Sequence, residues 1–257
     1  MAPTVVFRQV AMLGDSITQQ SWGDGGTGAA LANAYQRKLD VLNRGLSGYN
    51  TAWALPVAQQ WLPKTTDSLP ETALLIIWFG ANDAALPPSP QALTIEEFKA
   101  NLHTLISLVR SPTSPHYSPS TKILLITPPP VDAEVRGADL MARDPPRVPD
   151  RDAERTRQFA EAVKEVGKEA EIPAVDAWSR INEAAERDGG LTKYLNDGLH
   201  LTAEGYKLVT VGVSEAIHEF ISELHWDHIE QTFPHWADIP NLGALGPQFL
   251  APDSRLV

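Results

Sequence analysis

The 257-residue sequence contains no cysteine, which excludes disulfide bonds and thiol catalysis and suits a reducing compartment. It also lacks an apolar run long enough to span a membrane, and no basic lead with a long apolar stretch stands at its start. We therefore expect neither an integral membrane segment nor a signal peptide. The Asn-x-Ser/Thr acceptor pattern is missing too. Together these absences predict a cytoplasmic protein.

Basic residues are few: 21 lysines and arginines face 32 acidic residues, for a formal net charge of −11. This charge repels polyanions, so nucleic acid and anionic membrane surfaces are unsuitable partners, and a neutral small molecule fits better. We find no internal repeat and no linker. The sequence predicts a single domain over 1–257, in which 225–257 forms a tail packed on the body or on a partner. The apolar and aromatic residues of this tail make a homodimer a working hypothesis.

The pattern of apolar residues predicts strands that alternate with helices. The segment 72–79 is almost continuously apolar, as in a central parallel strand. Strands are expected at 4–13, 40–44, 72–79, 122–126 and 172–175, and helices at 29–42, 51–61, 93–110, 149–170 and 203–224. The stretches 111–120 and 128–149 are expected to be loops. This alternation predicts an α/β fold with a mostly parallel sheet covered on both faces.

Polar residues that could carry chemistry follow three of the predicted strands. Ser16, Gly48 and Asn82 come after successive strands, and ligands of such folds gather at the carboxyl ends of the strands. Ser16 can be a nucleophile if a base accepts its proton. Near the other end, His200 can be that base, and Asp197 can hold the second nitrogen of its ring. The amides of Ser16 and Gly48 and the side chain of Asn82 would then stabilise an oxyanion.

Each of these residues also has a plain structural interpretation. Ser16 could cap the following helix, and the pair Asp197 and His200 could be a turn with a surface histidine. Gly48 could serve only a turn with positive φ, and Asn82 could be an ordinary turn residue. If Ser16 is considered by itself, helix capping is the better interpretation. The combination of the segments favours catalysis.

Four segments in order carry a resemblance to a known family. They are Gly14 to Ser16, Asn43 to Gly48, Gly80 to Asp83, and Asp197 to His200. In these segments the chain resembles the SGNH (GDSL-type) hydrolases. The resemblance implies a flavodoxin-like three-layer α/β/α sandwich and hydrolysis of small, acetate-type esters through a serine acyl-enzyme. It implies no cofactor and no metal.

Other functions remain open on the sequence alone. The same catalytic site could belong to a thioesterase, a lysophospholipase or a carbohydrate deacetylase, and a non-catalytic binding protein could keep the fold. An ordinary α/β-hydrolase is disfavoured because Ser16 does not lie in a Gly-x-Ser-x-Gly pattern. Histidines and an aspartate crowd the tail, and we interpret them as a solvated amphipathic segment in preference to a metal site. They are His225, Asp227, His228 and His235.

Overall fold

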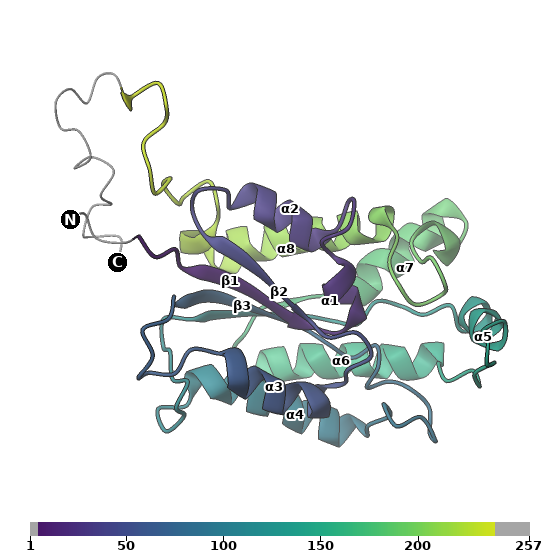
Figure 1. Ribbon diagram of the computed structural model, residues 1–257. Coiled ribbons are helices and arrows are strands. Elements are labelled where there is room, and N and C mark those ends of the chain that lie inside the picture. The colour runs from purple at the N-terminus through teal and green to yellow at the C-terminus, as the bar shows by residue number, and fades with distance from the viewer. Residues whose placement is uncertain (1–4, 240–257) are drawn as a thin grey trace.

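The computed structural model describes residues 5–239 (Figure 1). Residue 4 of the predicted first strand and residues 240–257 of the predicted tail lie outside the described residues. Within 5–239 the chain forms a five-stranded sheet in the order β2-β1-β3-β4-β5, with every neighbouring pair parallel. The strands are β1 (Gln9–Gly14), β2 (Asp40–Gly45), β3 (Thr72–Trp78), β4 (Lys122–Ile126) and β5 (Ala174–Val175).

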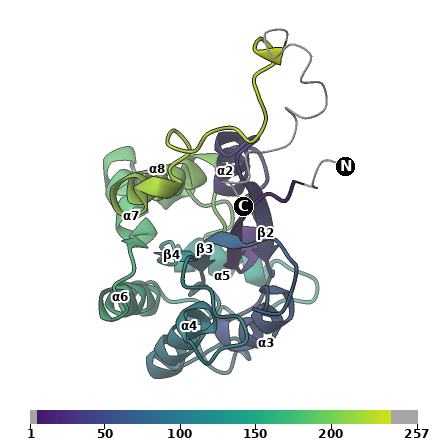
Figure 2. The ribbon, with the colours of Figure 1, turned by 90° about the vertical axis from the view of Figure 1, so that its left-hand side faces the viewer.

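Helices cover both faces of this sheet, as Figures 1 and 2 show. One apolar core lies between the sheet and three helices, α2 (Thr27–Ala34), α7 (Ala177–Asp188) and α8 (Ala203–Phe220). A second core lies on the opposite face, under α3 (Thr51–Trp61), α4 (Ile95–Arg110) and α6 (Ala153–Glu169). The predicted three-layer α/β/α sandwich is confirmed. Short elements complete the chain: α1 (Ser16–Gln20), α5 (Ala133–Met141), and the 3₁₀ turns Leu191–Lys193 and Ser222–Leu224.

The almost continuously apolar segment 72–79 corresponds to the middle strand of the sheet, β3. All seven of its residues are buried, because side chains on both faces of a doubly covered parallel strand enter a core. Leu74, Ile76 and Trp78 pack under α8, whereas Leu75 and Ile77 pack under α4 and α6.

Several predictions of local structure were wrong. The strand expected over 4–13 begins only at Gln9. The helix expected over 29–42 ends at Ala34, because the chain reverses through Arg37, whose φ is +62°, and enters β2 at Asp40. The expected loop 128–149 contains α5, which Asp132 caps by accepting a hydrogen bond from the Val135 amide. Helix α7 was not predicted at all.

The strand order creates one special place in the sheet. From β1 the chain moves outward to β2 and then returns to β3 on the other side of β1, so connections diverge at the carboxyl ends of β1 and β3. This divergence is the usual ligand-binding crevice of open α/β sheets. Ser16 follows β1 and Asn82 follows β3, so both stand at this crevice.

Candidate active site

Ser16 is the first residue of α1, directly after the turn that ends β1. Asp15 is the N-cap of this helix, and its Oδ1 accepts a hydrogen bond from the Ile17 amide at 2.9 Å. The capping role that the sequence allowed for Ser16 is therefore filled by its neighbour. The Ser16 side chain instead makes a hydrogen bond 2.9 Å long between its Oγ and Nε2 of His200.

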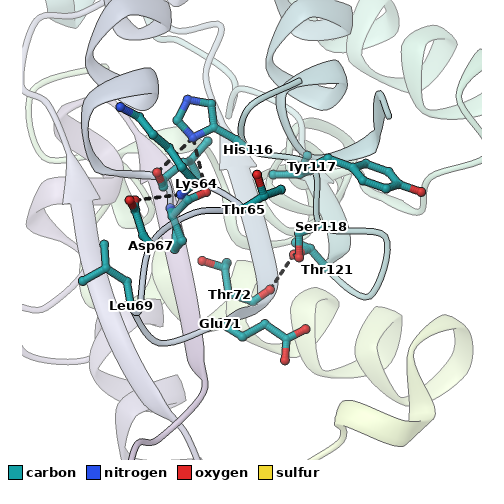
Figure 3. Close-up of a pocket in the computed structure, with 13 residues that line it drawn as sticks. Lys64, Thr65, Asp67, Leu69, Glu71, Thr72, His116, Tyr117, Ser118 and Thr121 are labelled. Atoms are coloured by element: carbon teal, nitrogen blue, oxygen red, sulfur yellow. Dashed lines mark hydrogen bonds between the residues drawn. The ribbon is translucent and has the colours of Figure 1, made fainter. Parts of the chain in front are cut away.

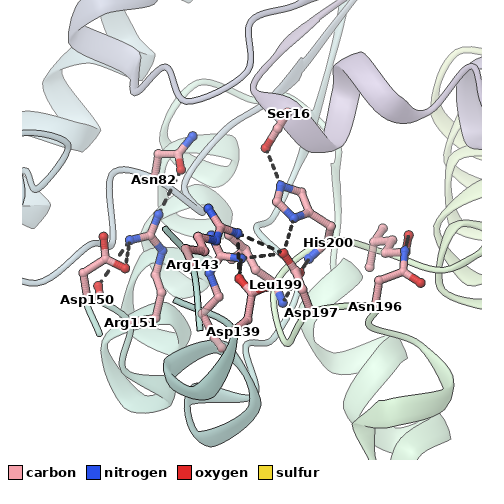
Figure 4. Close-up of polar contacts among 12 residues, drawn as sticks. Ser16, Asn82, Asp139, Arg143, Asp150, Arg151, Asn196, Asp197, Leu199 and His200 are labelled. Carbon is pink, nitrogen blue, oxygen red and sulfur yellow. Dashed lines mark hydrogen bonds and ion pairs between the residues drawn. The ribbon is translucent and has the colours of Figure 1, made fainter. Parts of the chain in front are cut away.

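A chain of hydrogen bonds continues from His200 to Asp197 (Figure 4). His200 Nδ1 lies 2.8 Å from Asp197 Oδ2, while the His200 amide donates to Oδ1 of the same carboxylate at 2.8 Å. Partial burial acts to raise the pKa of Asp197, but the hydrogen bonds from His200 and the nearby charge of Arg136 outweigh it. The pKa of Asp197 is therefore held well below its ordinary value. In the folded protein its carboxylate is ionised at neutral pH.

Helix α5 supports this carboxylate from behind. Gly198 has a φ of +78°, and a Cβ atom there would lie 2.5 Å from the Asp132 carbonyl oxygen. Glycine therefore lets α5 approach the turn that carries Asp197 and His200. From α5, the buried side chain of Arg136 forms an ion pair with Asp197 and a second one, 3.0 Å long, with Asp139.

The predicted oxyanion residues Gly48 and Asn82 line the same cavity as Ser16. Gly48 adopts a φ of +81°, the conformation expected for its turn. Asn82 is 3% exposed, and its Nδ2 donates to the Tyr49 carbonyl at 2.9 Å, which leaves a second hydrogen on this nitrogen. Among residues 5–239, neither the Ser16 amide nor the Gly48 amide has a hydrogen-bond acceptor. Three donors thus remain available near the Ser16 hydroxyl.

These groups face a common cavity of about 140 Å³. Its walls are mostly polar, and four arginines line it: Arg136, Arg143, Arg147 and Arg151. Ser16, Gly48, Asn82 and His200 are among the lining residues, so the structure brings together the sites that the sequence placed far apart. Sequence reasoning missed the arginines and Gln91. Arginine-rich stretches on loops carry no motif, and the only signal was the density of arginine between 136 and 157.

Two buried carboxyl groups, Asp15 and Asp83, directly neighbour the cavity-lining residues Ser16 and Asn82 in the sequence. Burial raises the pKa of Asp15 to about 7, although the hydrogen bond from the Ile17 amide acts against it. Burial likewise raises the pKa of Asp83 to about 6. Asp83 accepts hydrogen bonds from the Thr51 amide at 2.8 Å and from the Thr51 hydroxyl at 2.6 Å. It therefore ties the start of α3 to the loop after β3.

A second cavity, of about 170 Å³, lies near the amino end of β3 (Figure 3). Its one histidine, His116, is buried and hydrogen-bonded through Nδ1 to the Leu62 carbonyl at 3.0 Å. Thr121 donates to the Thr72 carbonyl at 2.6 Å. These side chains stabilise loops, and the cavity holds no counterpart of the Ser16–His200 pair.

Two histidines of the tail, His225 and His228, lie beside each other and beside His218 of α8, with ring centroids 5.2 to 6.2 Å apart. Nδ1 of His225 lies 3.7 Å from a carboxylate oxygen of Asp227, but within the described ranges no three histidine or carboxylate side chains are placed to share a metal ion. None of the helices in residues 5–239 has the length and apolar character needed to traverse a bilayer.

The fold and the site define a class of protein: an α/β/α hydrolase with a serine, a histidine and a carboxylate in one hydrogen-bonded chain. The model of the GDSL-like lipase/acylhydrolase family matches residues 12–208, and the chain belongs to this family. It is a serine esterase that hydrolyses ester bonds, as the esterase names of its relatives also indicate.

Among these relatives, a GDSL esterase/lipase of Arabidopsis thaliana is 37% identical over 216 residues, which cover 82% of this chain and 86% of the relative. An isoamyl acetate-hydrolyzing esterase 1 homolog of Bos taurus is 35% identical over 94% of both chains. The resemblance to isoamyl acetate-hydrolysing esterases lies in six segments: Gly28–Leu31, Tyr35–Asp40, Arg44–Tyr49, Trp53–Leu55, Gly80–Ala84 and Asp197–His200.

Solved structures share the fold. A lipase/acylhydrolase from Enterococcus faecalis superposes with a TM-score of 0.59 at 24% identity, covering 88% of this chain and 100% of the other. An acetylxylan esterase from Geobacillus stearothermophilus, solved as a catalytic mutant, gives 0.58 at 21% identity over 83% and 95%.

Proposed function

We propose that the protein hydrolyses small, acetate-type esters through an acyl-enzyme on Ser16. The observation that carries the proposal is the chain of hydrogen bonds from Ser16 Oγ through the His200 ring to Asp197. His200 Nε2 takes the hydroxyl proton as Ser16 Oγ bonds to the ester carbonyl carbon. Asp197 holds the ring in the tautomer whose Nε2 is free to accept that proton, and it stabilises the imidazolium that forms.

The donors opposite His200 complete the first half of the reaction. The carbonyl oxygen becomes an oxyanion near the amides of Ser16 and Gly48 and the Asn82 side chain, each of which can donate one hydrogen bond. The intermediate then collapses, the bond to the alcohol oxygen breaks, and the imidazolium returns its proton to the leaving alcohol. In the second half, a water molecule loses a proton to His200 and attacks the acyl-enzyme. Ser16 leaves with that proton, and the free acid is released.

The size of the cavity supports a short acyl group. A volume of about 140 Å³ beside Ser16 fits a group of a few heavy atoms, and its lining is mostly polar. A long acyl chain would need an extended apolar channel, so the thioesterase and lysophospholipase readings are less well supported. The polar walls favour one second candidate, a deacetylase of acetylated carbohydrates, whose alcohol carries many hydroxyl groups.

The test is nucleophile replacement with a matched control. Ser16→Ala should remove nearly all hydrolysis of p-nitrophenyl acetate and all covalent labelling by a fluorophosphonate, read by mass spectrometry. Ser47 lines the same cavity, but the His200 ring is hydrogen-bonded to Ser16 and Asp197, so Ser47→Ala should keep both. Full activity in the Ser16 variant would refute the assignment of Ser16 as the nucleophile. A panel of acetates with alkyl and sugar alcohols, followed by longer acyl chains, separates the two candidate substrates.

We also propose a cytoplasmic, homodimeric protein. The lack of cysteine supports the location. The side chain of Trp236 in the tail is 75% exposed, and a second copy of the chain could cover it, which supports the dimer. Sedimentation equilibrium that finds only monomer at high concentration would refute the dimer.

A further inference from the structure

One buried arginine of the cavity wall contacts a proposed oxyanion donor. Arg151 is 7% exposed, and its Nη1 pairs with the Asp150 carboxylate at 2.8 Å (Figure 4). Its Nη2 donates to Asn82 Oδ1 at 3.0 Å and to Gln91 Oε1 at 3.2 Å. A single nitrogen of the guanidinium thus contacts two amide side chains. Because both are uncharged, these contacts do not serve to neutralise a charge.

Both amides lead to the oxyanion donors. Asn82 is itself one of the donors proposed above. Gln91 reaches the other side, because its Nε2 donates to the Gly48 carbonyl at 2.8 Å. Its main-chain carbonyl also accepts from Asn50 Nδ2 at 2.9 Å, which fixes Gln91 to the start of α3. Arg151 therefore contacts the side-chain donor Asn82 directly. It reaches the turn of the main-chain donor Gly48 through Gln91.

The contacts also decide which end of the Asn82 amide faces the substrate. The two ends of this amide have nearly the same shape, so only hydrogen bonds distinguish them. In the observed orientation Oδ1 meets the guanidinium and Nδ2 meets the Tyr49 carbonyl. A rotation by 180° would place the NH₂ group against Arg151 and an oxygen against the Tyr49 carbonyl, and both contacts would be repulsive. The spare hydrogen of Nδ2 is thereby kept in the site.

We propose that Arg151 is a positioning residue for the oxyanion hole, which orients the Asn82 amide and, through Gln91, the Gly48 turn. The inference rests on the proposed function, since it assigns the support of the same oxyanion donors. Arg151 acts where charge develops in the transition state, so it contributes to turnover more than to binding of the uncharged ester.

The first variant is Arg151→Met, which keeps the length of the side chain and removes its donors. Loss of one oriented donor costs about 10²-fold to 10³-fold in kcat in comparable sites, so we expect kcat to fall about 10²-fold with KM changed less than about threefold. A trifluoromethyl ketone, which forms an anionic adduct with the serine, should lose affinity in proportion to kcat/KM. Arg151→Lys keeps the charge but not the two-acceptor geometry, and should fall between the wild type and the methionine variant.

Arg155 provides the matched control. It is half-buried, and it donates to the Ala84 and Ala85 carbonyls at 3.1 and 3.2 Å without a hydrogen bond to Asn82 or Gln91. Arg155→Met should lower stability but leave the affinity of the ketone, relative to KM, unchanged. If Arg151→Met does not fold, Gln91→Ala tests the same link, with an expected loss of kcat of about tenfold.

A double-mutant cycle separates positioning from general damage. Arg151→Met should lower kcat far less in the Asn82→Ala background than in the wild type, because its main target is then absent. Equal effects in both backgrounds, or a fall of kcat below threefold in the folded single variant, would overturn the inference. An active Ser16→Ala variant would instead refute the proposed function, so the two failures are distinguishable.

Discussion

The buried carboxyl of Asp15 should make the stability of the protein fall as pH rises. The perturbation that tests this is Asp15→Asn, which keeps an oxygen to cap α1 but cannot ionise. Burial raises the pKa of Asp15 in the folded state, so the folded chain binds this proton more tightly than the unfolded chain does. The resulting stabilisation is complete below the unfolded pKa and is lost as pH rises through the folded pKa.

The magnitude follows from the two pKa values. With 3.8 for the unfolded state and about 7 for the folded state, Asp15 loses about 3 kcal/mol of stabilisation between pH 5 and pH 8. Asp83, at about 6, adds about 1 kcal/mol over the same interval by the same relation. The wild-type free energy of unfolding should therefore decline across this range by an amount that Asp15→Asn reduces by more than half.

Urea denaturation at constant ionic strength, repeated at several pH values from 5 to 8, measures the effect. The difference between the wild type and Asp15→Asn isolates Asp15 from the other titrating groups. Asp24, on the exposed turn after α1, supplies the control variant Asp24→Asn, whose curve should parallel that of the wild type. A difference between wild type and Asp15→Asn that stays constant with pH would refute the reasoning.

Two further predictions concern the support of His200. Asp197→Asn should lower kcat about 10³-fold to 10⁴-fold in a folded protein, because an amide no longer enforces the His200 tautomer whose Nε2 accepts the proton of Ser16. An unchanged kcat in steady-state kinetics would contradict this role. Arg136→Met should lower the free energy of unfolding by about 2 kcal/mol, below the cost of a fully buried pair because Asp139 and Asp197 are partly exposed. Equal urea midpoints for this variant and the wild type would contradict the structural role of α5.

Much of the fold was predictable because its signals are local. The continuous apolar run of β3 identifies a strand buried on both faces without knowledge of its neighbours. Helix α7 had readable signals in Asp176 at its N-cap and Gly189 after its end, but its polar composition hid them. Helix α5 had weaker ones, since it is short, contains Gly137 and lies between proline-rich stretches.

The remainder depends on contacts that no local pattern encodes. Helix α2 ends early although good helix formers follow it, because the chain must turn to place β2 beside β1. The segments of the candidate site were predictable from their places after strands, whereas Arg136 and Arg151 were not. Their roles depend on which carboxylate or amide a long side chain reaches across the fold, and sequence spacing does not record this.

The hydrogen bond between Ser16 and His200 joins residues 184 positions apart. Closing so long a loop is entropically costly, and in native proteins it is compensated only when the intervening elements have packed. The Ser16–His200 pair can therefore form only after the first strand and the segment before α8 have reached their final places. Ester hydrolysis, followed during refolding, would report on the completion of the whole sandwich, and a chain that ends before His200 would be inert however well its first strands pair.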